Sequence, residues 1–125
     1  MDIIRRDAIE EFANPGATSR QLLHPGNAPS ARVTITRVTL EPGAVNSRHT
    51  HSGSEQTWVA LAGSGELLLA GEATLPFAEG DVARFAPGDV HGFRNTGAVP
   101  FVYIAVTAPP LDFRGAYESH SVAPR

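Results

Sequence analysis

The middle of the chain alternates between apolar and polar positions in short runs separated by turns. Ala31–Glu41 presents apolar side chains to both faces of an extended segment, and Pro100–Val106 is strongly apolar. Turns recur at intervals of roughly 8–12 residues, which is typical of antiparallel sandwiches and barrels. No helical period lies between the runs, so the pattern predicts an all-β fold. Further strands are predicted at Gln56–Leu61, Glu66–Ala70, Thr74–Phe77, Asp81–Phe85 and His91–Asn95.

The two ends of the chain carry a weaker pattern. Asp2–Ala13 is compatible with a short helix, and equally with an edge strand because it begins with two β-branched isoleucines. Arg20–Ser30 contains two prolines and a glycine and is expected to be a loop. A polar tail follows Pro109 and Pro110.

Length and composition fit one ordinary globular domain. The chain has 125 residues, 42% of them hydrophobic and 18% charged, which is enough for one core and too little for two. We expect one domain over residues 1–125, with a barrel core at about 31–107, an N-terminal arm at 1–30 and a C-terminal tail at 108–125.

Several function classes are excluded by composition. There is no cysteine, so disulfides and thiolate ligands are impossible, and all ten basic residues are arginine, which excludes a Schiff-base lysine. The net charge is −3 with no basic stripe, so we expect no nucleic-acid partner. No apolar run resembles a membrane span or a signal peptide, and we expect a cytoplasmic protein without membrane association.

Three histidines stand at positions that suggest chemistry. His49 and His51 are two residues apart, and side chains at this spacing on a strand share one face. His91 follows a turn at the start of another predicted strand. A pair of this kind is by itself more often a solvated polar pair than a ligand set. The histidines therefore need a wider pattern before a metal site can be inferred.

That wider pattern is present in two motifs that resemble those of the cupin superfamily. The first motif has a glycine, five residues, His-x-His, an acid and a later glycine, and Gly43, His49, His51 and Gly63 fall on it. In the second, Gly80, Gly88, His91 and Asn95 fall on the family positions, with Ala86 where the family usually has proline. The resemblance implies a jelly roll, also called a double-stranded β-helix, with one metal ion at the centre of a single barrel.

The sequence departs from the family pattern at the acidic ligand. Counting back from Gly63 places Gln56 at the position where the family usually has glutamate, and Glu55 lies one residue early. A shift of one residue on a strand turns a side chain to the opposite face. We therefore expect Gln56 to point inward together with Trp58, and keep Glu55 as the alternative ligand.

The ligand set implied by the resemblance is His49, His51, Gln56 and His91. It would hold one divalent transition metal ion, and Fe, Mn, Ni, Zn and Co are all compatible with imidazole and amide ligands. Three neutral imidazoles and an amide leave the full charge of the ion uncompensated. Such a site should bind metal more weakly than one with glutamate and should favour an anionic exogenous ligand.

Aromatic residues near the predicted ligands are candidates for a substrate pocket. Trp58 and Phe93 each lie two residues from a predicted ligand, so each is either a pocket wall or a plain core residue. Tyr103 on the last apolar strand is expected in the core. Cupins of this size commonly pair, so a homodimer is expected, with a seam near Ala31–Val38 if that strand is an exposed edge.

The expected function is that of a metal-dependent enzyme acting on a small organic molecule. A dioxygenase is the first hypothesis for the reaction, followed by Lewis-acid isomerase, cyclase or decarboxylase chemistry. The alternative is a non-catalytic module that binds or senses a small molecule, because the fold hosts many activities. A third and weaker reading is a metal that serves structure alone.

Overall fold

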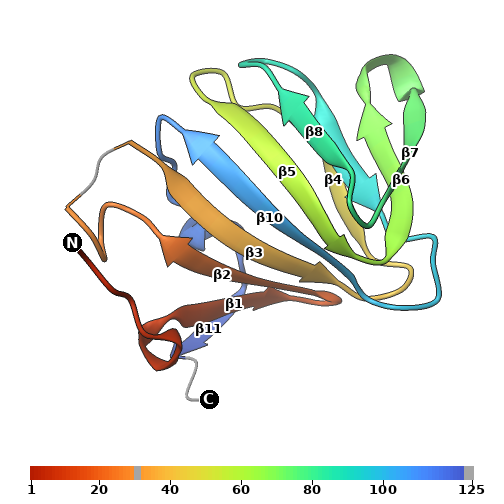
Figure 1. Ribbon diagram of the computed structural model, residues 1–125. Helices are drawn as coiled ribbons and strands as arrows, with labels where there is room; N and C mark the ends of the chain where they lie inside the picture. Colours follow the sequence, from red (N-terminus) through yellow and green to blue (C-terminus); the bar gives the residue numbers. More distant parts are fainter. Residues whose placement is uncertain (30–31, 123–125) are drawn as a thin grey trace.

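The computed structural model describes residues 1–29 and 32–122, which form two antiparallel sheets that face each other (Figure 1). The seven-stranded sheet has the order β11-β1-β2-β3-β10-β5-β8, and the four-stranded sheet has the order β4-β9-β6-β7. No helix in the described residues is long and apolar enough to cross a membrane. The strands are β1 Glu10–Asn14, β2 Ala17–Leu23, β3 Thr34–Leu40, β4 Val45–His49, β5 Glu55–Ala62, β6 Ser64–Leu69, β7 Thr74–Ala78, β8 Val82–Phe85, β9 His91–Arg94, β10 Phe101–Ala108 and β11 Ser119–Val122.

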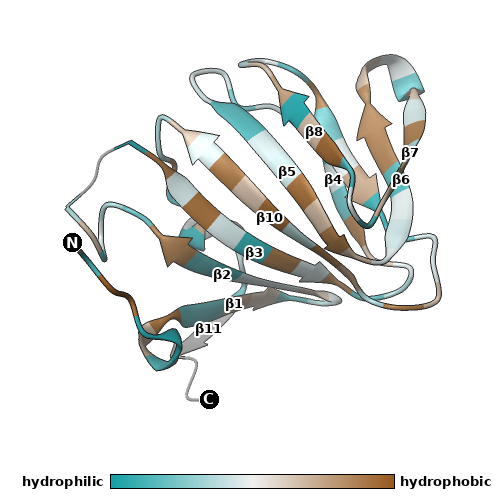
Figure 2. Cartoon of the chain, viewed as in Figure 1, coloured by the Kyte–Doolittle hydropathy of each residue, from teal (hydrophilic) through white to brown (hydrophobic). Residues whose placement is uncertain are grey.

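This arrangement is the jelly roll that the sequence predicts. Every strand predicted in the middle of the chain is present, although the predicted start at Ala31 lies outside the described residues and β3 begins at Thr34. Burial along β10 alternates residue by residue, and Figure 2 shows the matching bands of hydropathy along β5 and β10. The inward side chains of both sheets form one core because a strand turns alternate residues to the same face.

Both ends of the chain extend the large sheet beyond the expected barrel core. β2 pairs with β3, and β11 pairs with β1, which lies between β11 and β2. Asp2–Ala13 is therefore not a helix: it contains a single turn at Arg6–Ala8 and then enters β1. It is not an edge strand either. Of the predicted loop Arg20–Ser30, the first four residues belong to β2.

The dimer seam expected near Ala31–Val38 is wrong. β3 lies between β2 and β10 and pairs with both, so its backbone groups are already used. Within the described residues, the outermost strands of the large sheet are β11 and β8. Alternation within one strand cannot tell an edge from a central position, because the neighbours come from distant sequence. The homodimer itself stays a prediction.

Phe93 belongs to the core and does not wall a pocket. Its side chain is fully buried and stacks on Phe101, with ring centroids 3.9 Å apart, while Phe77 packs against both rings. Trp58 is also buried, yet it sits where the core opens into a cavity between the sheets. The core thus fills one part of the sandwich and leaves the other part hollow.

Candidate metal centre

Three histidines converge at one point beside this cavity, and two of them, His49 and His51, line it. His49 ends β4, His51 follows in the next loop and His91 begins β9. One ring nitrogen of each lies within 4.8 Å of those of the other two. The ring centroids are 4.4 to 5.2 Å apart. The resemblance implied this convergence. The strand face that the spacing predicted for His49 and His51 is not shared, because β4 ends at His49 and His51 lies in the following loop.

A bulge in β4 brings His49 opposite His91. Asn46 pairs with Phe93 and His49 pairs with His91, so β4 carries one extra residue between these two pairs. The bulged backbone comes close to Gly92, where a Cβ atom would lie 2.5 Å from the Asn46 carbonyl oxygen. Only glycine fits at position 92 because the backbone of β4 approaches it so closely. This close approach helps to set the position of His49.

Backbone carbonyls orient two of the imidazoles. His49 Nδ1 lies 2.7 Å from the Ser47 carbonyl oxygen, and His91 Nδ1 lies 2.9 Å from that of Asp89. In each ring, an Nδ1–H that donates to the carbonyl leaves the Nε2 lone pair free. Hydrogen bonds of this kind commonly fix the tautomer and orientation of histidine ligands.

Gln56 completes the cluster from β5. Its side chain is buried, and Oε1 lies 3.1 Å from His91 Nε2. The Trp58 indole N–H donates to this oxygen at 2.8 Å, and Gln56 Nε2 donates to Thr107 Oγ1 at 2.8 Å. Because an indole N–H can only donate, the amide oxygen must face Trp58 and the histidines. Glu55 points outward and contacts Arg84, with its side chain 39% exposed.

His91 and His51 are held in the neutral form near neutral pH. Burial lowers the pKa of His91 to about 4, and the neighbouring histidines add to this against the raising effect of the Asp89 backbone. Burial, and then His49, also lower the pKa of His51. Neutral imidazoles are the form that binds metal.

The hydrogen-bonding groups of the cluster fit a cation. If His91 Nδ1 carries the proton, the Nε2 lone pair faces the Gln56 oxygen at 3.1 Å; if Nε2 carries it, the Nδ1 lone pair faces the Asp89 carbonyl at 2.9 Å. In either tautomer of neutral His91, one ring lone pair therefore faces the oxygen of another acceptor. His51 Nε2 is buried without a hydrogen-bond partner. A cation bound by these lone pairs would satisfy both, so the donor set suits a transition metal ion.

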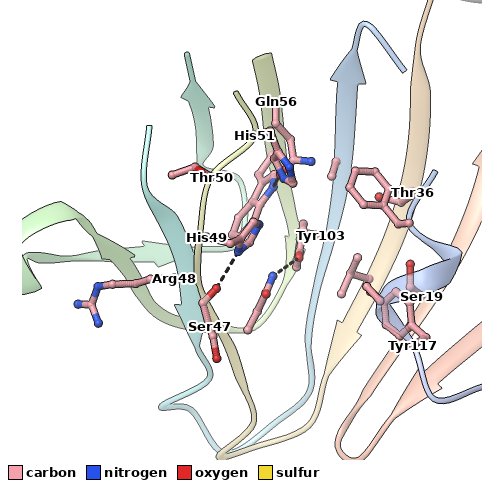
Figure 3. A pocket seen from close by; sticks show the side chains of 16 residues that line it. Ser19, Thr36, Ser47, Arg48, His49, Thr50, His51, Gln56, Tyr103 and Tyr117 are labelled. Atoms are coloured by element: carbon pink, nitrogen blue, oxygen red, sulfur yellow. Dashed lines mark hydrogen bonds between the residues drawn. The ribbon is translucent and has the colours of Figure 1, made fainter. Parts of the chain in front are cut away.

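The cavity beside the histidines has a volume of about 410 Å³. Trp58 and Tyr103 stack along one side, with ring centroids 4.2 Å apart. Arg48 reaches the rim, but its guanidinium donates to the Leu69 and Ala73 carbonyls and points away from the histidines (Figure 3). None of the described residues that line the cavity is aspartate or glutamate. The lining therefore carries no negative charge, and its polar groups are imidazoles, amides and hydroxyls, apart from Arg48 at the rim.

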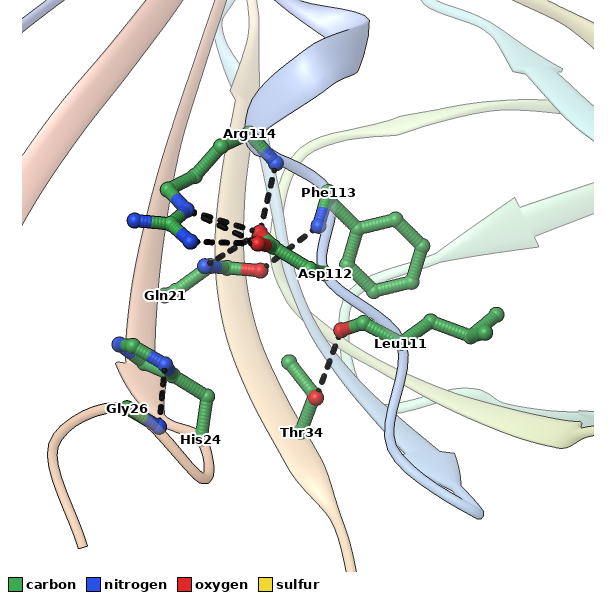
Figure 4. A network of polar contacts seen from close by, with 8 residues as sticks. All are labelled: Gln21, His24, Gly26, Thr34, Leu111, Asp112, Phe113 and Arg114. Carbon is green, nitrogen blue, oxygen red and sulfur yellow. Dashed lines mark hydrogen bonds and ion pairs between the residues drawn. The ribbon is translucent and has the colours of Figure 1, made fainter.

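The segment after β10 closes one side of the cavity and is held by a polar network (Figure 4). The Phe113 backbone N–H donates to Gln21 Oε1 at 2.9 Å, and Gln21 Nε2 donates to Asp112 at 3.3 Å. Arg114 donates to the same carboxylate at 2.6 Å. These contacts tie the C-terminal segment to β2.

The Asp112 contacts predict a specific acid dependence. Hydrogen bonds from Arg114 hold the pKa of Asp112 at about 2, below its ordinary 3.8. A carboxylate with a lowered pKa adds stability above pH 3.8, and this contribution is lost as the pH falls toward 2. Asp112→Asn should therefore melt slightly below the parent at neutral pH and equal it near pH 2. Thermal unfolding across this range is the measurement, with the exposed Asp7→Asn as control. A difference that does not change with pH would contradict the assignment.

Some residues of the site could not be found from the sequence pattern. Gly92 and Thr107 act through contacts with distant strands, and Phe113 and Tyr117 lie in the polar tail, where no pattern links them to the site. Asn95 is a turn residue, as its family position suggests. Its side chain donates to the Leu40 and Val99 carbonyls and accepts from the Gly97 N–H.

Comparison with known families agrees with this geometry. The model of the family described as "Cupin domain" matches residues 36–107, more than half of the chain. The protein is a member of the cupin family. The matched region contains all three histidines, Gln56 and Trp58.

Similar proteins confirm the fold of this cupin without fixing its activity. It is 27% identical over 105 residues to an uncharacterized protein of Methanocaldococcus jannaschii, a match that covers 83% of each chain. A predicted oxalate decarboxylase from Thermotoga maritima has a similar structure, with a TM-score of 0.74 and 24% identity over 86% of this chain and 98% of the other. The polyketide cyclase RemF from Streptomyces resistomycificus gives a TM-score of 0.75 and 20% identity over 87% and 80%.

Proposed function

We propose that this cupin is a metal-dependent enzyme that acts on a small organic molecule bound as an anion, with dioxygenase chemistry as its reaction. The observation that carries the proposal is a cluster of three imidazoles and one amide, without a carboxylate, beside a cavity whose described lining also contains no carboxylate. His49, His51, His91 and Gln56 would hold one divalent ion. When bound, the ion would supply Lewis acidity and, as iron, a site for dioxygen.

The charge of the cluster favours an anionic substrate. Three imidazoles and one amide bring no negative charge, so the positive charge of a bound divalent ion would be left to its exogenous ligands. The aromatic rings of the lining strengthen this attraction because they are less polarisable by charge than water. A carboxylate or enolate group of a substrate is the natural partner for such a site.

The cavity offers little for proton transfer, which is why dioxygenase chemistry stands before isomerase, cyclase or decarboxylase chemistry. None of the described residues lining it is a carboxylate that could act as a general base. Burial raises the pKa values of Tyr103 and Tyr117, so both remain protonated at neutral pH. An apolar interior also admits the apolar co-substrate dioxygen.

The role of Gln56 is tested by two neighbouring substitutions of opposite sense. Gln56→Glu adds a negative charge inside the cluster, so divalent metal should bind about ten-fold more tightly or better. The same variant without metal should melt at a lower temperature, because an unpaired carboxyl is then buried. Glu55→Gln is the matched control, and it loses only the exposed contact to Arg84. Calorimetric metal titration separates them; weaker binding by Glu55→Gln alone would show that Glu55 is the ligand.

Turnover is tested by oxygen uptake. The iron-loaded protein, mixed with a panel of small enolic and carboxylic compounds, should consume dioxygen with at least one of them, and His49→Ala should not. Turnover without oxygen consumption would move the assignment to isomerase, cyclase or decarboxylase chemistry. Saturable binding of a compound without any turnover would favour the non-catalytic binding module.

A further inference from the structure

The cavity is lined by two parts of the chain, one inside and one outside the region that matches the cupin family. Its metal end, with the histidines and Gln56, lies within the region that matches the cupin family. Ser19 on β2 and the segment that carries Phe113 and Tyr117 lie outside that region, yet they line the same cavity. Figure 3 shows Ser19, Thr36 and Tyr117 on the side of the cavity away from the histidines. This far wall includes Ser19 and Tyr117, which lie outside the matched region, and Thr36, which is the first matched residue.

The far wall carries neutral hydroxyl groups. Asn46 Nδ2 donates to the Tyr103 hydroxyl oxygen at 3.2 Å, and Ser19 hydrogen-bonds to the Tyr117 hydroxyl. An accepting hydroxyl still has its own proton to donate. Thr36 adds a third hydroxyl on this side. The wall can thus bind a neutral polar group, and it offers no charge to pair with a second ionised group.

Aromatic rings occupy the space between the two ends. Trp58 stacks with Tyr103 on one side, and the edge of Phe113 contacts His51 with ring centroids 5.7 Å apart. All of these rings belong to the cavity lining. Rings favour offset or edge contacts with a flat aromatic ligand. The middle of the cavity therefore suits a planar, apolar body.

The far wall is also fixed in place. The Phe113 backbone is hydrogen-bonded to Gln21, and the Asn14 side chain donates to the Ala116 carbonyl at 2.9 Å. Asn14 also accepts from the backbone N–H of Glu118 at 2.8 Å. Residues on both sides of Tyr117 are thus tied to β1. A wall held in this way discriminates between ligands because little ordering is needed on binding.

We infer that Phe113, Tyr117 and Ser19 select the substrate, and that this substrate is a planar aromatic anion with an uncharged hydrogen-bonding group away from its anionic end. The inference rests on the proposed function, because the anionic end is assigned to the metal cluster. It adds the shape and the second functional group of the substrate. It also assigns the choice of substrate to segments outside the family region.

Four hydroxamates test this inference in parts on the zinc-loaded protein by titration calorimetry. Acetohydroxamate probes the metal end alone, benzohydroxamate adds the ring, and 3- and 4-hydroxybenzohydroxamate add a hydroxyl. Benzohydroxamate should bind about ten-fold more tightly than acetohydroxamate because of the buried ring. At least one hydroxylated form should gain about five-fold more, the size of one hydrogen bond.

Two substitutions assign these gains to residues. Tyr117→Phe should remove the gain from the ring hydroxyl and leave acetohydroxamate binding unchanged. Phe113→Ala should reduce the preference for benzohydroxamate over acetohydroxamate several-fold. Glu118→Ala, an exposed neighbour in the same segment, is the matched control and should change neither ratio. Ratios between ligands cancel any general loss of folded protein.

The outcomes separate the inference from the proposed function. If acetohydroxamate binds but the ring adds no affinity, or if neither substitution changes the ratios, the substrate class is wrong while the metal site stands. If the protein takes up no zinc, the proposed function fails first. If affinity rises from acetohydroxamate to the hydroxylated ligands, and the two substitutions remove these gains as described, the inference and the proposed function are both supported.

Discussion

Replacing His49 by alanine should lower the affinity for divalent metal by more than about 100-fold. Loss of a residue that only hydrogen-bonds to a metal ligand already costs roughly 10–100-fold, and loss of the ligand itself should cost more. His49 supplies one of three ring nitrogens that lie within 4.8 Å of one another, and its Nδ1 is already oriented by the Ser47 carbonyl. Its removal leaves two histidines and an amide. Metal titration of the wild type and the variant measures the change.

A histidine outside the cluster provides the control. His24 is not one of the three clustered histidines, and its Nδ1 accepts from the Gly26 N–H of its own loop. His24→Ala should keep wild-type metal affinity. Far-ultraviolet circular dichroism of His49→Ala should match the wild type, because the side chain is not part of the core. Equal metal affinity in the two variants would remove His49 from the ligand set.

Replacing Gly92 by alanine should cost about 3 kcal/mol of folding free energy, which is at the upper end for an overpacked position. The new Cβ would lie 2.5 Å from the Asn46 carbonyl oxygen and 2.9 Å from the Ser47 carbonyl carbon. Both are backbone atoms of the bulge in β4, so a flexible side chain cannot give way. The bulge must shift, and His49 would move with it.

Gly92→Ala should therefore lose metal affinity as well as stability, although residue 92 is not a ligand. Chemical denaturation gives the stability, and metal titration well below the unfolding transition gives the affinity. Gly53→Ala is a matched control, because a Cβ there has no heavy atom within 4 Å. A stable Gly92→Ala protein with unchanged metal affinity would show that close approach at the bulge does not position His49.

The residues that sequence reasoning placed correctly share one property, which is that their signal is local. Alternation predicted the central strands, and counting back from Gly63 turned Gln56 inward and Glu55 outward, as the structure has them. Trp58 faces the cavity for the same reason. The motif count set the register of Gln56, and period-two geometry within the strand then gave the faces of Glu55 and Trp58.

The errors arose where the outcome depends on partners that are distant in sequence. Phe93 has the spacing of a pocket residue, but Phe101 and Phe77 enclose it from other strands. The alternation of β3 is compatible with an edge strand, but β2 pairs with it on the side away from β10. The C-terminal segment reaches the cavity because Gln21 and Asp112 meet across 91 positions of sequence. The hydrophobic periodicity of the sequence carries no information about such contacts.

The most direct test of the account is the metal content of the protein purified without added metal or a chelating resin. Elemental mass spectrometry should find close to one transition metal ion per chain, with iron for the dioxygenase, and a much lower content in His49→Ala. A protein that contains no metal and takes up none on titration with Fe²⁺, Mn²⁺, Co²⁺, Ni²⁺ or Zn²⁺ would contradict the account.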